Sequence, residues 1–223
     1  IEDCTPNIIE LLPQLKKKAH QVLIKTSPMM DIDLAIRSLG HVDEVHVIAV
    51  DNDCKEVLYT VAEISSEVTK LSMINFKKGK LESLDSTISE ISTARVSFSS
   101  PKIYLYEPNA AIMKAGAFNL ISERFSIPKL HRHTHLYTSD KISPEFPGRI
   151  FKVKHLLPYS KKEIKRAVPN GKANITIRNF KDDVAAIRKK TGIKDGGELY
   201  LFGFTDINTA QRIAICSKVE PLS

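Results

Sequence analysis

Tryptophan is absent from this 223-residue sequence, cysteine occurs only three times, and no long apolar run is present. Cys4, Cys54 and Cys216 are widely spaced and form no Cys-x-x-Cys pair, so neither a disulfide framework nor a zinc knuckle is implied. No stretch approaches the roughly 20 apolar residues that cross a bilayer, and no signal-peptide pattern is found. These absences predict a globular protein in a reducing, cytoplasmic setting.

The common short motifs of catalysis and nucleotide binding are also missing. The sequence has no Gly-rich phosphate or dinucleotide loop, no GxSxG and no HExxH. Gly192, Gly196 and Gly197 do not follow a predicted strand, and they are expected to end a helix and form a turn. The visible residues by themselves therefore specify no catalytic site.

Charge is distributed unevenly along the chain. Residues 1–101 contain 11 Lys and Arg against 15 Asp and Glu, whereas residues 102–223 contain 22 against 11. Such asymmetry predicts two units with different partners, and a basic half attracts polyanions such as nucleic acid. A solvated basic surface that only keeps the protein soluble is the alternative.

The first 76 residues predict an α/β unit. A helix is expected to start at Thr5-Pro6, a strand at residues 21–25, a helix capped by Asp31 or Asp33 and a near-continuously apolar strand at residues 44–50. This order predicts a parallel sheet with right-handed crossovers. Residues 55–63 and 68–76 alternate like an antiparallel pair, and residues 77–100 form either a linker or a hairpin arm.

The second half predicts a middle segment and then an α+β domain. A helix is expected at residues 108–125, followed by strands in the middle segment, residues 101–148. Residues 149–223 follow the order βαβαββ, which predicts a compact domain with a mostly antiparallel sheet.

Three stretches resemble a known family. Residues 2–15, 21–36 and 42–58 look like the later half of a class I S-adenosylmethionine-dependent methyltransferase domain. "YLYEPNAAIMKAGAF", with "HTHLYTSD" and "FPGRIFKV", resembles the middle segment of one bacterial branch of that superfamily. "ANITIRNFKDDVAAIRKKTGIKDGGELYLFGFT" is similar to the C-terminal THUMP-like domain of that branch.

The resemblance implies that this chain is the C-terminal portion of such a methyltransferase. Its fold class would be the C-terminal half of a Rossmann-like sheet at residues 1–76, followed by a ferredoxin-like or THUMP-like α+β domain. The family's cofactor glycine loop and acidic motif would precede Ile1, so catalytic residues stay unknown. S-adenosylmethionine is expected in the full-length protein, and no cofactor is expected on this chain alone.

The densest basic stretch, residues 149–194, holds 14 Lys and Arg residues. On a short helix within it, one side carries four cations: Lys161, Lys162, Lys165 and Arg166. Four like charges on one face repel one another unless an anion is present, which favours contact with phosphate. The THUMP resemblance implies structured RNA, such as tRNA or rRNA, as the partner.

Three further cations in this stretch are candidate substrate contacts. Arg149 and Lys152 lie on a predicted strand, and Arg178 follows another. His131, His133 and His135 alternate, so one strand face would present all three as a metal site or, as we expect, as an exposed basic face.

Three functions remain open. The first is a methyltransferase that acts on RNA, whose basic C-terminal half holds the substrate. The second is a non-catalytic nucleic-acid-binding protein built on a methyltransferase scaffold. An intact glycine loop upstream would favour the first, and its loss would favour the second. The third is a protein–protein scaffold, which would be favoured if binding to tRNA or rRNA showed no salt dependence.

Overall fold

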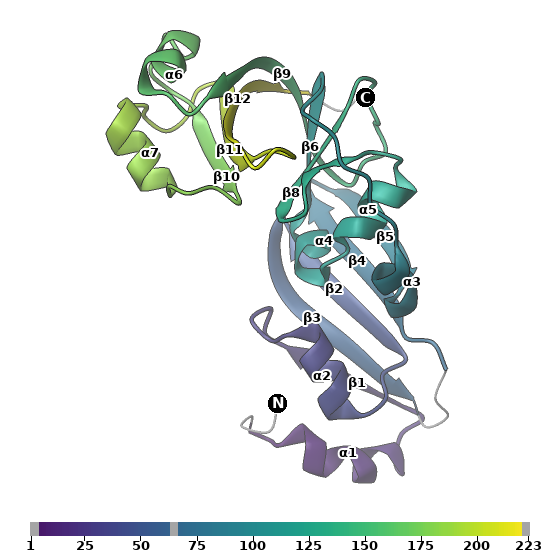
Figure 1. The fold of residues 1–223 in the computed structure, drawn as a ribbon. Helices are drawn as coiled ribbons and strands as arrows, with labels where there is room; N and C mark the ends of the chain where they lie inside the picture. The colour runs from purple at the N-terminus through teal and green to yellow at the C-terminus, as the bar shows by residue number, and fades with distance from the viewer. Residues whose placement is uncertain (1–4, 63–66, 220–223) are drawn as a thin grey trace. The chain divides into compact units, whose positions relative to one another are not determined.

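The computed structural model describes residues 5–62 and 67–219; Cys4 lies outside this part (Figure 1). The chain forms two compact units. The first unit consists of residues 1–94 and 109–118, and the second of residues 95–108 and 119–223.

The first unit has one five-stranded sheet with strand order β1-β3-β2-β4-β5. Its elements in chain order are α1 (Ile8–Lys16), β1 (Gln21–Thr26), α2 (Ile32–Leu39), β2 (Glu44–Val50), β3 (Asp53–Ala62), β4 (Lys70–Lys77), β5 (Lys80–Thr87), α3 (Ile88–Thr93) and α4 (Ala110–Ala115).

The pairing of these strands corrects two expectations. β1 and β2 run in the same direction, but they do not pair, because β3 lies between them and is antiparallel to both. β4 does not pair with β3 either, since it joins the other edge of β2 in parallel. The sheet is therefore mixed, and the local patterns predicted its strands but not their neighbours.

Only one face of this sheet carries the core. Val45, Val47 and Ala49 of β2 are fully buried, whereas the alternate residues of the strand are half-buried or exposed. A near-continuously apolar strand such as residues 44–50 is typical of a strand covered on both faces, but β2 is fully buried on one face alone. The apolar sides of α2 and α4, including Ala35 and Ile112, supply the other half of the core.

Side-chain caps fix where the helices of the first unit begin. Asp31 accepts a hydrogen bond from the Leu34 amide at 2.8 Å, as predicted for an N-cap. The first helix is capped by Asn7 rather than Thr5, since the Asn7 side chain accepts from the Ile9 amide. Residues 80–87 form β5, the returning arm of a hairpin from β4.

Residues 109–118, a short segment between two parts of the second unit, complete the first unit. The helix expected at residues 108–125 is two helices, α4 and α5 (Phe118–Arg124), because Gly116 adopts a left-handed conformation and ends α4. Asn109 is 1% exposed and caps α4 through the Ile112 amide. Residues 109–118 thus leave the second unit, contribute a core helix to the first, and return.

The second unit has a seven-stranded sheet with strand order β10-β11-β12-β9-β6-β8-β7. Besides α5, its elements in chain order are β6 (Tyr104–Pro108), β7 (Lys129–His131), β8 (Thr134–Ser139), β9 (Gly148–Pro158), α6 (Lys161–Ala167), β10 (Asn174–Arg178), α7 (Val184–Thr191), β11 (Leu199–Thr205) and β12 (Gln211–Lys218). From β9 onward the order is βαβαββ, as predicted.

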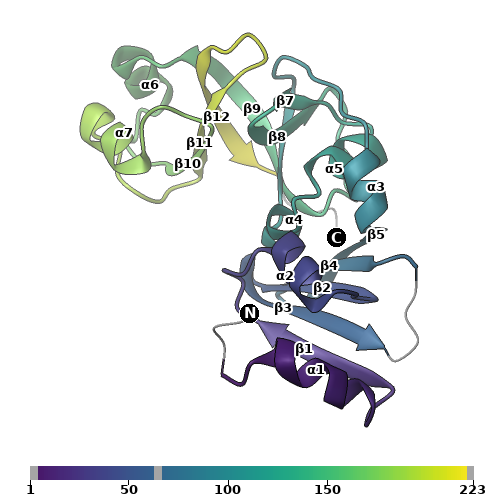
Figure 2. The same ribbon diagram turned by 60° about the horizontal axis from the view of Figure 1, so that its bottom comes forward.

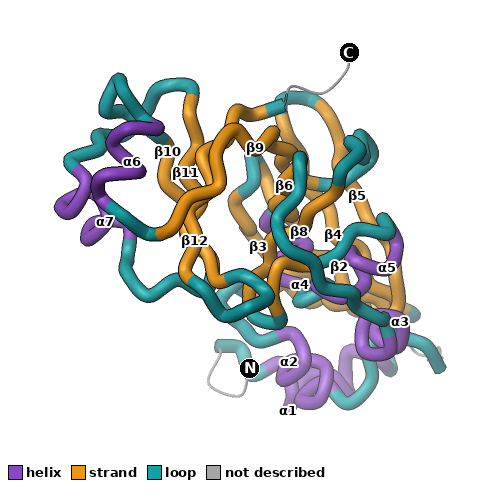
Figure 3. Tube along the Cα trace, turned by 45° about the horizontal axis from the view of Figure 1, so that its top comes forward, coloured by secondary structure: helices purple, strands orange, loops and turns teal. Residues whose placement is uncertain are grey.

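This second sheet is rolled. Its edge strand β10 contacts β8, although four strands separate them in the sheet, and the Thr134 hydroxyl of β8 donates to the Thr205 carbonyl of β11 at 2.8 Å. The enclosed face holds one core of apolar side chains from β6, β7, β8, β9, β11 and β12. The outer face of β9–β12 is covered by α6 and α7, which lie together beside β10 and β11 (Figure 3).

Candidate nucleic-acid interface

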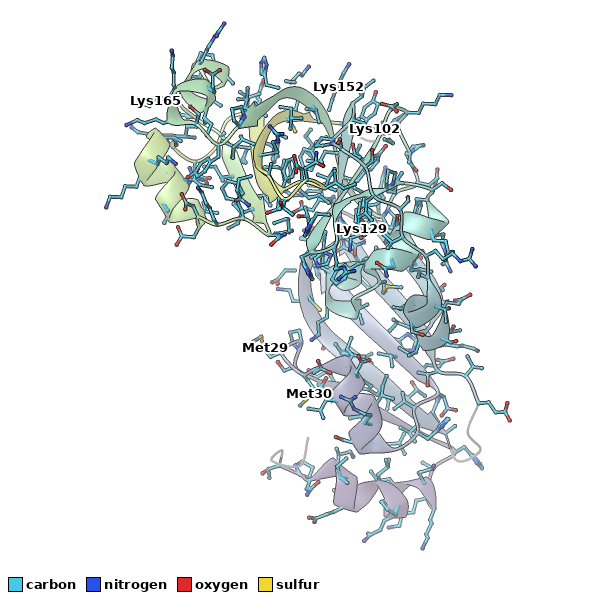
Figure 4. All side chains as sticks on the ribbon, in the orientation of Figure 1. Met29, Met30, Lys102, Lys129, Lys152 and Lys165 are labelled. Atoms are coloured by element: carbon cyan, nitrogen blue, oxygen red, sulfur yellow. The ribbon has the colours of Figure 1, made fainter. Side chains whose placement is uncertain are left out.

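Helix α6 presents the four predicted cations to solvent. Its inner side is fixed by Ile164, which is fully buried against the outer face of the rolled sheet. The cationic side chains that precede and follow Ile164 along the helix are all exposed: Lys161, Lys162, Lys165 and Arg166. Within the described part of the chain, no carboxylate forms an ion pair with any of these four. In Figure 4, Lys165 extends away from the helix.

Helix α7 extends this basic surface. The Lys190 ammonium lies 3.7 Å from the centroid of the Tyr159 ring, which follows β9 and precedes α6. The Tyr159 hydroxyl donates to Asp182 at 2.6 Å, and the pKa of Tyr159 is raised, first by burial and then by this carboxylate. α6 and α7 lie side by side in Figure 2.

Lys152 lies on β9 and is exposed, so it is also available to a ligand. Figure 4 shows its side chain directed away from the strand. No acidic partner for Lys152 exists among the described residues.

Arg149 and Arg178 occupy a different environment, because both bind the carboxylate of Glu107. Arg149 donates from Nε to Glu107 Oε2 at 2.8 Å and also from Nη2 to the same oxygen. Arg178 donates from Nη2 to Glu107 Oε1 at 2.7 Å. The Glu107 side chain is 3% exposed, whereas the two arginine side chains remain 28% and 32% exposed.

Aromatic rings orient the guanidinium of Arg149. It lies 5.4 Å from the centroid of the Phe151 ring and 6.0 Å from that of Tyr200. Both rings belong to the core enclosed by the rolled sheet. Stacking of this kind holds a guanidinium plane in one orientation.

A second buried carboxylate in the same unit has only one arginine. Asp206 accepts from Arg212 Nε at 2.8 Å and from the backbone amides of Asn208 and Ala210. Burial alone would raise the pKa of Asp206, but these hydrogen bonds outweigh it and lower the pKa. This pair closes the β11–β12 turn and is electrically neutral.

The three histidines do not share one strand face. His131 ends β7, His133 lies in the turn, and His135 is on β8. Burial, together with the positive charges of Lys129 and Arg178, lowers the pKa of His135 to about 4. Among the residues that the structure describes, no group of three or more His, Cys, Asp or Glu side chains could hold a metal ion.

Two of the three cysteines lie in the described part of the chain. Cys54 and Cys216 are free thiols, and burial raises the pKa of Cys216 to about 12. No helix in the described ranges is long and apolar enough to span a membrane.

Comparison with known families and structures finds similarities over residues 104–218 and over the whole chain. A family model of a ferredoxin-like domain matches residues 104–147, and a model described as THUMP domain-like matches residues 148–218. Residues 148–218, here named the THUMP-like domain, are similar to that family. The THUMP-like domain therefore comprises β9 to β12 with α6 and α7, and it contains all seven cations predicted as substrate contacts.

The whole chain is similar to a solved structure of a candidate methyltransferase from Porphyromonas gingivalis W83. The two are 32% identical, with a TM-score of 0.92, and the match covers 98% of this chain and 56% of that one. This chain thus spans little more than half the length of that relative and corresponds to its C-terminal part, which confirms the predicted resemblance. None of the curated proteins matches the chain.

The sequence interpretation missed Glu107. Its signal was a single carboxylate within the apolar strand "YLYEP", a position where burial requires a cationic partner. The identity of those partners was not visible, because they lie 42 and 71 residues further along the chain.

Proposed function

We propose that this chain is the RNA-holding C-terminal portion of an S-adenosylmethionine-dependent methyltransferase, and that the THUMP-like domain binds the RNA backbone. The observation that carries the proposal is the exposed face of α6, with four cations and no acidic partner among the described residues. The similarity to a candidate methyltransferase supports the enzymatic part.

The electrostatics of α6 favour a polyanion as the ligand. Lys161 and Lys165 are one helical turn apart, as are Lys162 and Arg166, so each pair is mutually repulsive in the free protein. Phosphates would relieve this repulsion and release condensed counterions, which is the main source of affinity for nucleic acid. RNA, rather than DNA, is favoured by the THUMP-like domain and by recognition of A-form shape through backbone contacts.

The proposal assigns residues 1–76 to the later half of a Rossmann-like methyltransferase sheet. In support, β1 and β2 run in the same direction with α2 between them in the chain, although β3 lies antiparallel between the two strands. Residues 77–100 contribute β5 and α3 to the first unit and lead to the middle segment, residues 101–148, and then to the substrate domain, residues 149–223.

S-adenosylmethionine would be held by parts of the full-length protein outside this chain. At the carboxyl end of β1, where an open α/β sheet places its ligand, the polar side chains serve the local fold. Thr26 donates to the Val57 carbonyl at 3.5 Å, and Ser27 accepts from the Met29 amide at 3.2 Å. These residues do not fit a cofactor site by themselves, so no chemical step is assigned to them.

Charge reversal on α6 tests the RNA proposal. The variant K161E/K162E/K165E/R166E should bind tRNA or rRNA fragments at least about 100-fold more weakly, and the slope of log affinity against log salt should fall by about 3. Fluorescence anisotropy at several salt concentrations measures both quantities.

A matched control reverses four exposed lysines of the first unit: K17E/K18E/K78E/K80E. It changes the net charge by the same amount and should lose far less affinity. Equal losses in the two variants would show a general charge effect and contradict a site on α6. Circular dichroism of both variants confirms that they fold.

A further inference from the structure

We infer that Arg149, Arg178 and Glu107 form a pre-organised site for one phosphate group, in which the arginines bind the anion and Glu107 positions them. The inference deepens the proposed function and rests on it for the identity of the ligand, a phosphate of the RNA backbone. This site is separate from the cations of α6, none of which contacts Glu107.

The fold brings the three residues together from three strands. Glu107 is on β6 and lies opposite Arg149 of β9 in the strand register. Arg178 ends β10, which is four positions from β6 in the sheet, and it reaches Glu107 only because the sheet is rolled. One carboxylate binds both arginines at hydrogen-bond distance, so the two guanidinium groups are held within a few ångströms of each other.

The charge of this cluster is unbalanced. Two guanidinium groups share one carboxylate, which leaves one positive charge in excess at a place where Glu107 is 3% exposed. Paired cations confined in this way repel each other, and an additional anion relieves that repulsion. About a third of each arginine side chain remains exposed, so an anion in solution has access to both.

Both guanidinium groups also keep free donors. Each has five N–H bonds, of which Glu107 and the Ile177 carbonyl use two on Arg178 and Glu107 uses two on Arg149. Arg178 Nε has no acceptor among the described residues but is buried, so the spare donors of this residue that an anion could use are those of Nη1 and Nη2. A phosphate accepts several hydrogen bonds at once and matches the forked geometry of such donors.

The orientation of the donors is fixed before a ligand binds. Glu107 holds both arginines, and the rings of Phe151 and Tyr200 confine the plane of Arg149. Fixing these long side chains in advance removes much of the entropy cost of binding. The neutral Asp206–Arg212 pair lacks this excess charge, and it serves as an internal comparison.

The first test uses inorganic phosphate and the 223-residue chain. Phosphate should shift the arginine Nε–H resonances of Arg149 and Arg178 in a saturable manner, and it should leave that of Arg212 in place. The R178Q variant should lose the response of Arg149 as well, because one phosphate bridges both groups.

The second test uses RNA. R149Q and R178Q should each weaken binding about 10-fold and reduce the salt slope by about 1, whereas R212Q should leave both unchanged. R178K keeps the charge but loses the forked donors, so it should recover the salt slope and only part of the affinity. Glu107→Gln should weaken binding even though it removes a negative charge, because the arginines lose their anchor.

The outcomes separate the two proposals. If R149Q and R178Q lower the melting temperature but change neither RNA affinity nor the phosphate response, the cluster only closes the sheet and the inference is overturned. If phosphate binds to both arginines but RNA does not bind the chain, the anion site stands and the RNA proposal fails. Stronger RNA binding by Glu107→Gln would also overturn the positioning role.

Discussion

Each unit joins distant segments of its own through a polar cluster; the cluster of the first unit is half-buried at Glu82, that of the second is buried at Glu107, and the two differ in net charge. In the first unit the cluster is built from amides: Asn75 donates to Glu82 at 2.9 Å, Asn109 donates to the same carboxylate at 3.3 Å, and Asn52 accepts from the Ala110 amide. Lys77 lies 3.7 Å from Glu82 and balances its charge. In the second unit, Glu107 is instead bound by two arginines.

The difference separates a purely structural cluster from one with spare binding capacity. The amide cluster is electrically neutral, and its groups serve α4 and the strand ends around it. The arginine cluster has one charge in excess and donors in reserve, so it closes the rolled sheet and can still bind an anion. The composition has a charge bias in the same direction, since the excess of Lys and Arg lies in residues 102–223.

The largest effect is expected from Glu107→Ala. Removing the carboxylate leaves two partly buried guanidinium groups unpaired, which should destabilise the second unit by about 3 kcal/mol. Hydrogen exchange measured by NMR would report the loss at core amides such as Phe151, while Val47 in the first unit keeps its protection. Unchanged protection at Phe151 would contradict a structural role for Glu107.

A smaller effect, confined to the first unit, is expected from Asn109→Ala. The substitution removes the cap of α4, which is worth about 1–2 kcal/mol, together with a hydrogen bond to Glu82. Urea unfolding followed through the NMR signal of the Val47 amide should show this loss of unfolding free energy. Asn109→Ser keeps a capping oxygen and should restore more than half of it; a Ser variant as unstable as the Ala variant would contradict the capping explanation.

The smallest effect is a pH dependence confined to the second unit. The pKa of His135 is about 4 in the folded chain and near 6.5 in the unfolded chain, so the unfolded state binds more protons between these values. Stability is therefore complete above pH 6.5 and declines as the pH falls towards 4. Allowing for partial exposure, the loss at pH 5 should be about 1 kcal/mol.

Comparison with the His135→Gln variant isolates the part of the pH dependence that His135 causes. The difference in unfolding free energy between the original chain and the variant should change between pH 7 and pH 5. A constant difference over that range would show that His135 does not titrate as its surroundings imply.

Local signals in the sequence predicted the elements well. The cap at Asp31, the helix end at Gly192 and the βαβαββ order of the THUMP-like domain are all present. These features depend on residues a few positions apart, where capping, glycine conformation and hydrophobic period act directly. The resemblance to a methyltransferase was likewise confirmed, since it rested on long continuous stretches.

Non-local pairing could not be predicted in the same way. Nothing in the apolar strand at residues 44–50 indicated that β3 would separate it from β1, because a strand does not encode its neighbour. Similarly, the sequence marked Arg149 and Arg178 as cations but could not show that both bind Glu107. Of the predicted contacts, the four cations of α6 lie exposed as expected, and their binding to RNA stays a prediction.

The insertion of residues 109–118 into the first unit has a consequence for biosynthesis. All five strands of the first sheet have been translated by Thr87, yet Ala111 and Ile112 of its core follow the first strand of the second sheet. A ribosome must therefore release part of the second unit before the first can cover its apolar face. The two units cannot mature strictly one after the other, and the apolar face of the first sheet stays partly uncovered in that interval.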